Sequence, residues 1–188
     1  MWGFQLWANL PASHKMMDPR YRDVKNSQIP EVALESGARA RIICGEVRGV
    51  KGPVRDIVTD PQYLDVTVPA RSQFTHAVKP GHTAFTYVIE VKGYFDQGRK
   101  PYAYEVEGAG YFDFERECLI GPESLVLFGD GDRLMVTVAD TPVRFLFLSG
   151  KPIGEPVAWY GPIVMNTQEE LRIAFEEYRN GTFIKHKT

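Results

Sequence analysis

The amino-acid sequence predicts a mainly β protein, a jelly-roll antiparallel β-sandwich barrel with one short C-terminal amphipathic helix. Short strand-like segments recur roughly every 8–12 residues, with glycine and proline at the joints, which is typical of sandwiches and small barrels. Near the C-terminus the apolar spacing changes to that of a helix. Together the two patterns indicate one β domain followed by a helix.

The stretch at 80–93 predicts the central strand. It opens with the turn signal Pro80-Gly81 and then alternates between two faces that are both mostly apolar. A strand with two apolar faces is expected inside a sandwich. Downstream, residues 125–138 read as strand, turn and strand around the run Gly-Asp-Gly-Asp at 129–132, which favours a hairpin.

Further strands are predicted along the chain. The clearest is 63–69, where Leu64, Val66 and Val68 share one face. The other candidates are 1–10, 38–47, 54–59 and 143–148. The aromatic stretch 94–117 is interpreted as one more hairpin with a long loop, the alternative being an aromatic binding lip.

The predicted helix covers residues 168–180. Thr167 and Glu170 have the spacing of a capping box, and Asn180-Gly181 is a suitable stop. Four apolar side chains recur at helical spacing and are expected to be buried: Leu171, Ala174, Phe175 and Tyr178. The domain plan is therefore a linker strand and loop at 1–30, a barrel at 31–150 and a C-terminal extension at 151–188.

Composition narrows the class of protein. The net charge of −2, with dispersed basic residues, favours neither nucleic acid nor an anionic membrane surface as a partner. The apolar runs are too short to span a membrane, and a cytoplasmic location is expected. Cys44 and Cys118 are interpreted as buried thiols in a reducing compartment, with a disulfide left open.

Four blocks of sequence resemble the pirin family: 2–11, 19–24, 150–157 and 160–167. The last block, which leads into the acidic helix, is the most specific. Pirins resemble two cupin barrels in tandem, and this chain resembles the second barrel with its linker. Nothing in it resembles the first barrel.

The resemblance implies where a metal would bind. In pirins, histidines and a glutamate of the first barrel hold one iron, and some pirins act there as quercetin-type dioxygenases. In a cupin, the ligands would fall between His82 and Gly93 and near 134–136. The first segment has one histidine and the second has Leu-Met-Val, so no metal or other cofactor is expected. No catalytic residue is assigned.

The alternative is a rearranged metal site. His76 and His82 lie on either side of the Pro80-Gly81 turn, and Glu90 is the nearest candidate carboxylate. Such a site would hold iron or another divalent transition metal and support an oxidoreductase of the quercetin 2,3-dioxygenase type.

The first functional hypothesis is that the chain is a binding or assembly module. Trp2, Phe4, Leu6 and Trp7 would form an apolar interface. We expect a homodimer or other homo-oligomer, or a complex with a separate first-cupin pirin domain, and a small-molecule ligand in the barrel is compatible with this.

Overall fold

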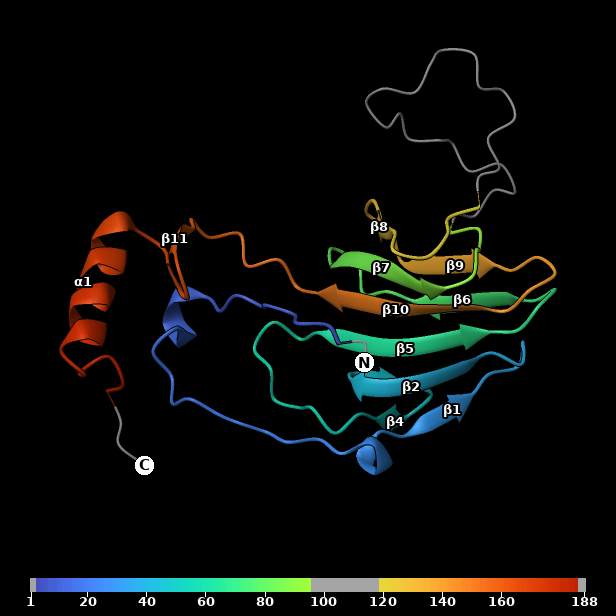
Figure 1. Cartoon of the computed structure of the whole chain (residues 1–188), viewed down its shortest axis with the longest axis horizontal. Coiled ribbons are helices and arrows are strands. Elements are labelled where there is room, and N and C mark those ends of the chain that lie inside the picture. The colour runs from blue at the N-terminus through green and yellow to red at the C-terminus, as the bar shows by residue number, and fades with distance from the viewer. Residues whose placement is uncertain (1–2, 96–118, 186–188) are drawn as a thin grey trace, which may run out of the picture. The chain divides into compact units, whose positions relative to one another are not determined.

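The computed structural model describes residues 3–95 and 119–185 (Figure 1). The described residues fall into two compact units. The larger unit lies within Val24–Lys151, and the smaller joins the segments Met1–Asp23 and Pro152–Thr188. The aromatic stretch 96–117 and Cys118 lie outside the described residues.

A six-stranded antiparallel sheet forms the base of the larger unit, with the strand order β1-β2-β5-β10-β7-β8. Its strands are β1 (Glu31–Ala33), β2 (Arg39–Cys44), β5 (Gln62–Val68), β7 (Thr83–Glu90), β8 (Leu125–Leu127) and β10 (Val143–Gly150). The strands expected at 63–69, within 80–93 and at 143–148 are confirmed as β5, β7 and β10. Figure 1 shows β10 between β5 and β7.

A two-stranded ribbon provides the second layer. It pairs β6 (Gln73–Ala77) with β9 (Arg133–Thr137), and Phe74 of β6 packs edge-on against Phe145 of β10 at 5.8 Å. Alternation along the strands directs one side chain in two inward, including Leu64, Val66 and Val68, as predicted. A short hairpin of β3 (Glu46–Val47) and β4 (Val50–Lys51) borders the same unit.

Two local predictions in this unit are wrong. The segments on either side of residues 129–132 do not pair as a hairpin, because β8 joins β7 while β9 joins β6. The Gly-Asp-Gly-Asp run therefore carries the chain from one layer to the other. Residues 54–59 form no strand, and only Val54 makes an isolated bridge, to Cys44.

The smaller unit contains a hairpin and a helix. The hairpin joins β11 (Ala158–Tyr160) to β12 (Ile163–Met165), and α1 (Gln168–Arg179) follows directly, close to the predicted bounds. Thr167 Oγ1 accepts a hydrogen bond from the Glu170 amide at 3.2 Å, and Glu170 Oε2 accepts one from the Thr167 amide at 2.9 Å. The predicted capping box is confirmed.

The helix buries part of the predicted apolar face. Leu171 and Ala174 are buried with residues of β11 and β12, and Phe175 is half-buried. The prediction is wrong for Tyr178, which is 60% exposed and contacts Phe183 edge-on. The residues of α1 that are buried with the β11–β12 hairpin are Leu171 and Ala174, and Tyr178 lies beyond them toward the C-terminal end of the helix.

The described part of the N-terminal segment, residues 3–10, forms no strand. Two 3-10 turns follow it, at Ala12–His14 and Asn26–Gln28. Glu155 ties this segment to the rest of the smaller unit: its Oε2 accepts from the Ala12 amide at 2.7 Å and from Asn166 Nδ2 at 2.8 Å. Among the described helices, none has the length and apolarity needed to cross a membrane.

Candidate functional site

His76 is a mostly buried histidine in the second layer of the larger unit. It lies on β6 between Phe74 and Val78, which are both buried, so the strand alternation turns all three toward the interior. Its ring stacks on Phe74 with centroids 6.0 Å apart and meets Phe147 of β10 edge-on at 5.2 Å. Burial lowers the pKa of His76 from 6.5 to about 4, so the imidazole is neutral near pH 7.

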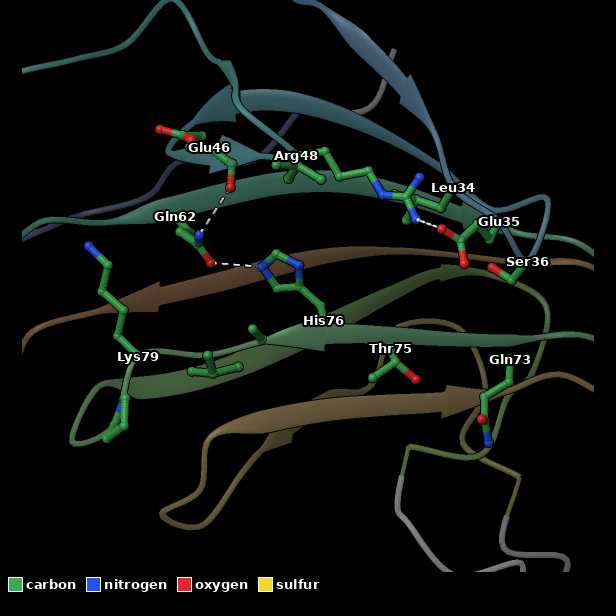
Figure 2. A pocket seen from close by; sticks show the side chains of 14 residues that line it. Leu34, Glu35, Ser36, Glu46, Arg48, Gln62, Gln73, Thr75, His76 and Lys79 are labelled. Atoms are coloured by element: carbon green, nitrogen blue, oxygen red, sulfur yellow. Dashed lines mark hydrogen bonds and ion pairs between the residues drawn. The ribbon is translucent and has the colours of Figure 1, made fainter.

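Gln62 fixes which nitrogen of His76 carries the proton. His76 Nε2 lies 2.9 Å from Gln62 Oε1, while Gln62 Nε2 faces the Glu46 carbonyl oxygen at 3.5 Å (Figure 2). In this orientation the Gln62 oxygen can only accept, so His76 Nε2 donates. His76 Nδ1 is then unprotonated, and no described residue makes a hydrogen bond to it.

A cavity of about 700 Å³ opens beside this imidazole and is called the His76 cavity below. Figure 2 shows Gln62, His76, Gln73 and Thr75 along one side and Arg48 with Glu35 along another. The remaining lining residues are Leu34, Ser36, Glu46, Val47, Ala77, Val78, Lys79 and Pro80. The wall therefore combines five apolar side chains with nine polar or charged ones, which makes it more polar than most small-molecule sites.

The charges around the His76 cavity are balanced. Arg48 Nη2 pairs with Glu35 Oε1 at 2.9 Å, and Lys79 pairs with Asp60. Glu46 lies 3.7 Å from the ammonium group of Lys51. A second hollow of about 580 Å³ lies beyond Gln62 and shares Glu46, Arg48, Gln62 and Lys79 with the first. The first hollow is lined by equal numbers of acidic and basic residues, while the second is lined by one more basic residue than acidic.

The three candidate metal ligands do not meet. His82 lies in the turn that precedes β7, and its amide donates to the Lys79 carbonyl. Glu90 ends β7 and pairs with Arg144 at 3.1 Å, while His76 Nε2 is held by Gln62. Among the described residues, no three histidine, cysteine, aspartate or glutamate side chains are placed to share an ion. These residues therefore do not fit the iron site of a cupin.

The remaining predicted site residues lie elsewhere. Cys44 is buried at the end of β2, and its thiol donates to the Pro61 carbonyl at 3.3 Å. Trp2 lies outside the described residues, while Phe4, Leu6 and Trp7 are exposed.

Two exposed tryptophans, Trp7 and Trp159, mark the smaller unit, and the surface that they form is called the aromatic surface below. Trp7 and Trp159 meet edge-on with centroids 6.4 Å apart, although each remains about two-thirds exposed, at 64% and 65%. Trp159 Nε1 donates to the Gly161 carbonyl at 2.8 Å, and Tyr160 leans on Phe175 at 5.4 Å. These contacts hold the rings in place while their outer faces stay accessible.

The sequence alone missed three of these features. From the sequence, His76 is a candidate metal ligand beside the Pro80-Gly81 turn, yet Phe74, His76 and Val78 occupy every second position, which is a strand signal. Tyr160 begins a block that resembles pirins and Trp159 lies just before that block, and the sequence predicts no role for either. Gln62 gave no signal, because its contact with His76 exists only after β5 and β6 are brought together.

The two facing antiparallel layers and their enclosed apolar core define the larger unit as a cupin domain. Residues 63–184 match the domain family described as the pirin C-terminal cupin domain. The chain therefore belongs to the pirin family.

Two relatives and one solved structure illustrate the match. Pirin-1 of Arabidopsis thaliana is 37% identical over 95% of this chain and 56% of its own length. A Thermoplasma acidophilum protein provisionally named quercetin 2,3-dioxygenase is 34% identical over 98% of this chain and 66% of its own. The structure of quercetin 2,3-dioxygenase from Acinetobacter baumannii aligns with TM-score 0.75 at 25% identity, over 94% of this chain and 55% of that one. The chain thus spans between about half and two thirds of these relatives.

Proposed function

We propose that this chain works as a pirin-type second cupin barrel whose role is assembly, and that its partner is a first cupin barrel of the pirin type. The observation that carries the proposal is the aromatic surface of the smaller unit. Trp7 and Trp159 are ordered by their mutual contact and yet expose most of their surface to solvent. Accessible tryptophans of this kind are enriched at the centres of protein interfaces.

The length of the relatives supports the choice of partner. Each relative contains a large part that this chain does not match, between about a third and a half of its length. That part is the proposed occupant of the aromatic surface. A second copy of this chain, which would give a homodimer, is the competing occupant.

Light scattering tests the assembly proposal. The purified chain is measured alone and mixed with the part of Arabidopsis Pirin-1 that it does not match, in the wild type and in a Trp7→Ser, Trp159→Ser double variant. Loss of both anchors should weaken association by about 30-fold, which corresponds to a hot-spot loss of about 2 kcal/mol. The control is Tyr21→Ser, which removes a ring that is 94% exposed and lies in the same unit.

Three outcomes separate the possibilities. Binding to the Pirin-1 segment that the double variant loses supports the proposed complex. A dimer of the chain alone that the double variant breaks supports self-assembly instead. A chain that stays monomeric and binds nothing, or a double variant that associates like the wild type, contradicts assembly through the aromatic surface.

The second candidate function is quercetin 2,3-dioxygenase activity, which the names of the Thermoplasma and Acinetobacter proteins suggest. The described residues of this chain do not fit the metal that such chemistry requires. Metal analysis of protein purified without chelators tests it. About one iron, nickel or copper ion per chain, lost on His82→Ala, would favour this candidate, and trace metal that His82→Ala leaves unchanged would count against it.

A further inference from the structure

The His76 cavity offers a hydrogen-bond acceptor whose usual partner is missing. His76 Nε2 donates its hydrogen bond to Gln62, so the lone pair of Nδ1 has no partner among the described residues. Figure 2 shows Nδ1 turned away from Gln62 toward the side of the cavity that carries Arg48 and Glu35. A polar atom that faces a cavity of this size is a recognition point for a ligand.

The charged residues that line the His76 cavity indicate which net charge a ligand could carry. Arg48 is neutralised by Glu35, and Lys79 is neutralised by Asp60, so neither cation is left over for an anion. The acids are paired in the same way, since Glu46 lies near Lys51. A charged ligand would lose part of its hydration without gaining a dedicated counter-charge, and this cost disfavours it relative to an uncharged one.

The apolar residues of the wall indicate that part of the ligand is apolar. Val47 and Val78 are buried apolar residues that border the cavity, and Leu34, Ala77 and Pro80 extend the same surface. A cavity of about 700 Å³ is within the range of sites for small organic molecules. An apolar ring would cover this wall, and a hydroxyl on the ring would reach the imidazole.

We propose that the His76 cavity binds a small uncharged molecule that carries a hydroxyl group on an apolar ring, with the hydroxyl donating to His76 Nδ1. The role of His76 is recognition. Burial keeps the imidazole a poor base, so the hydroxyl keeps its proton when it binds. The site is independent of the aromatic surface and of any metal.

Phenol is the probe, and titration of the full chain followed by ¹⁵N NMR of the histidine rings is the measurement. We expect saturable binding with a dissociation constant on the order of 1 mM, as suits a ligand of this size. The His76 Nδ1 signal should move on binding, while the ring signals of His82 stay in place. Anisole, in which a methyl ether replaces the hydroxyl, should bind at least about tenfold more weakly because it cannot donate.

Variants sharpen the test. His76→Phe keeps an aromatic ring in the core and removes the acceptor, so phenol should bind about tenfold more weakly. His82→Phe is the matched control, since His82 does not line the cavity, and phenol binding should not change. If His76→Phe fails to fold by circular dichroism, the movement of Nδ1 in the wild type decides the question.

The proposal is overturned by any of three results. Phenol does not saturate by about ten times the expected dissociation constant. Phenol binds while the His76 Nδ1 signal stays still. Benzoate, which is similar in size but anionic, binds more tightly than phenol.

Discussion

His76 Nε2 lies 2.9 Å from Gln62 Oε1, and this hydrogen bond holds a neutral imidazole in the interior of the cupin domain. The two residues come from β6 and β5, which belong to different layers of the domain. Their contact therefore joins the layers, and the protonation of His76 bears on the stability of the whole domain.

Stability of the domain should fall on acidification because of His76. In the unfolded chain a histidine binds a proton below pH about 6.5, whereas in the folded domain burial lowers the pKa to about 4. The stabilising contribution is complete above pH 6.5 and is lost as the pH falls toward 4, by up to about 3 kcal/mol. Urea unfolding at pH 7.0 and pH 4.5, followed by far-UV circular dichroism, measures it.

The control for this prediction is the His76→Phe variant. Its stability should change less than that of the wild type between the two pH values, by about 2 kcal/mol or more. An equal fall in both proteins would show that other groups cause the acid sensitivity.

The ion pair on the outer face of the sheet should matter for stability. Arg144 of β10 makes a bidentate contact with Asp65 of β5, at 3.0 and 2.9 Å, and the pair raises the pKa of Arg144 above its usual range. Because Asp65 is only 11% exposed, Asp65→Asn should lower the free energy of unfolding by about 2 kcal/mol.

An exposed pair provides the comparison for Asp65. Arg71 and Asp140 lie 2.9 Å apart with most of both side chains in solvent, and Asp140→Asn should change the free energy of unfolding by less than about 0.5 kcal/mol. Equal effects of the two substitutions in urea unfolding would contradict the assigned role of burial.

A substitution inside the core should stabilise the protein. Thr86 of β7 is fully buried, and its hydroxyl has no hydrogen-bond partner among the described residues. Thr86→Val keeps the shape and removes an unsatisfied polar group, so the free energy of unfolding should rise by about 1 kcal/mol. Thr83→Val, at an exposed position of the same strand, is the control and should have little effect. A loss of stability in Thr86→Val would mean that the hydroxyl is satisfied, for instance by a buried water.

The capping box of α1 should contribute to the stability of the smaller unit. Thr167→Ala removes the oxygen that accepts from the Glu170 amide and should cost about 1 kcal/mol. Tryptophan fluorescence reports this unit, because the three tryptophans of the chain all lie outside residues 24–151. Gln168→Ala, at an exposed position where alanine is a good helix former, should leave the unfolding curve almost unchanged.

Local pattern was enough to predict the regular parts of the fold. Leu64, Val66 and Val68 alternate as a strand should, and the Thr167–Glu170 spacing located the start of α1. The hairpin around residues 129–132 was wrong because strand partners are chosen by the whole sheet. β9 pairs with a strand that lies about sixty residues earlier, and a local turn signal carries no information about that choice.

The candidate site was harder to predict for the same reason. The sequence shows that a histidine is present at position 76 but not its protonation state. Its neutral form depends on burial beside Phe74 and Phe147, and its tautomer depends on the hydrogen bond to Gln62. Similarly, the contact between Trp7 and Trp159 joins positions from the two ends of the chain. Properties that arise from such distant contacts follow from the fold and not from the neighbouring residues.

The hydrogen bond from the Ala12 amide to Glu155 spans 143 positions of the sequence. The smaller unit consequently needs segments on both sides of the cupin domain, which itself uses the continuous stretch between them. During synthesis on the ribosome, the cupin domain can fold as soon as its own residues emerge, but the earlier segment with Trp7 must wait for the segment that follows the cupin domain. The contact between Trp7 and Trp159 can therefore form only after all residues of the cupin domain have been made.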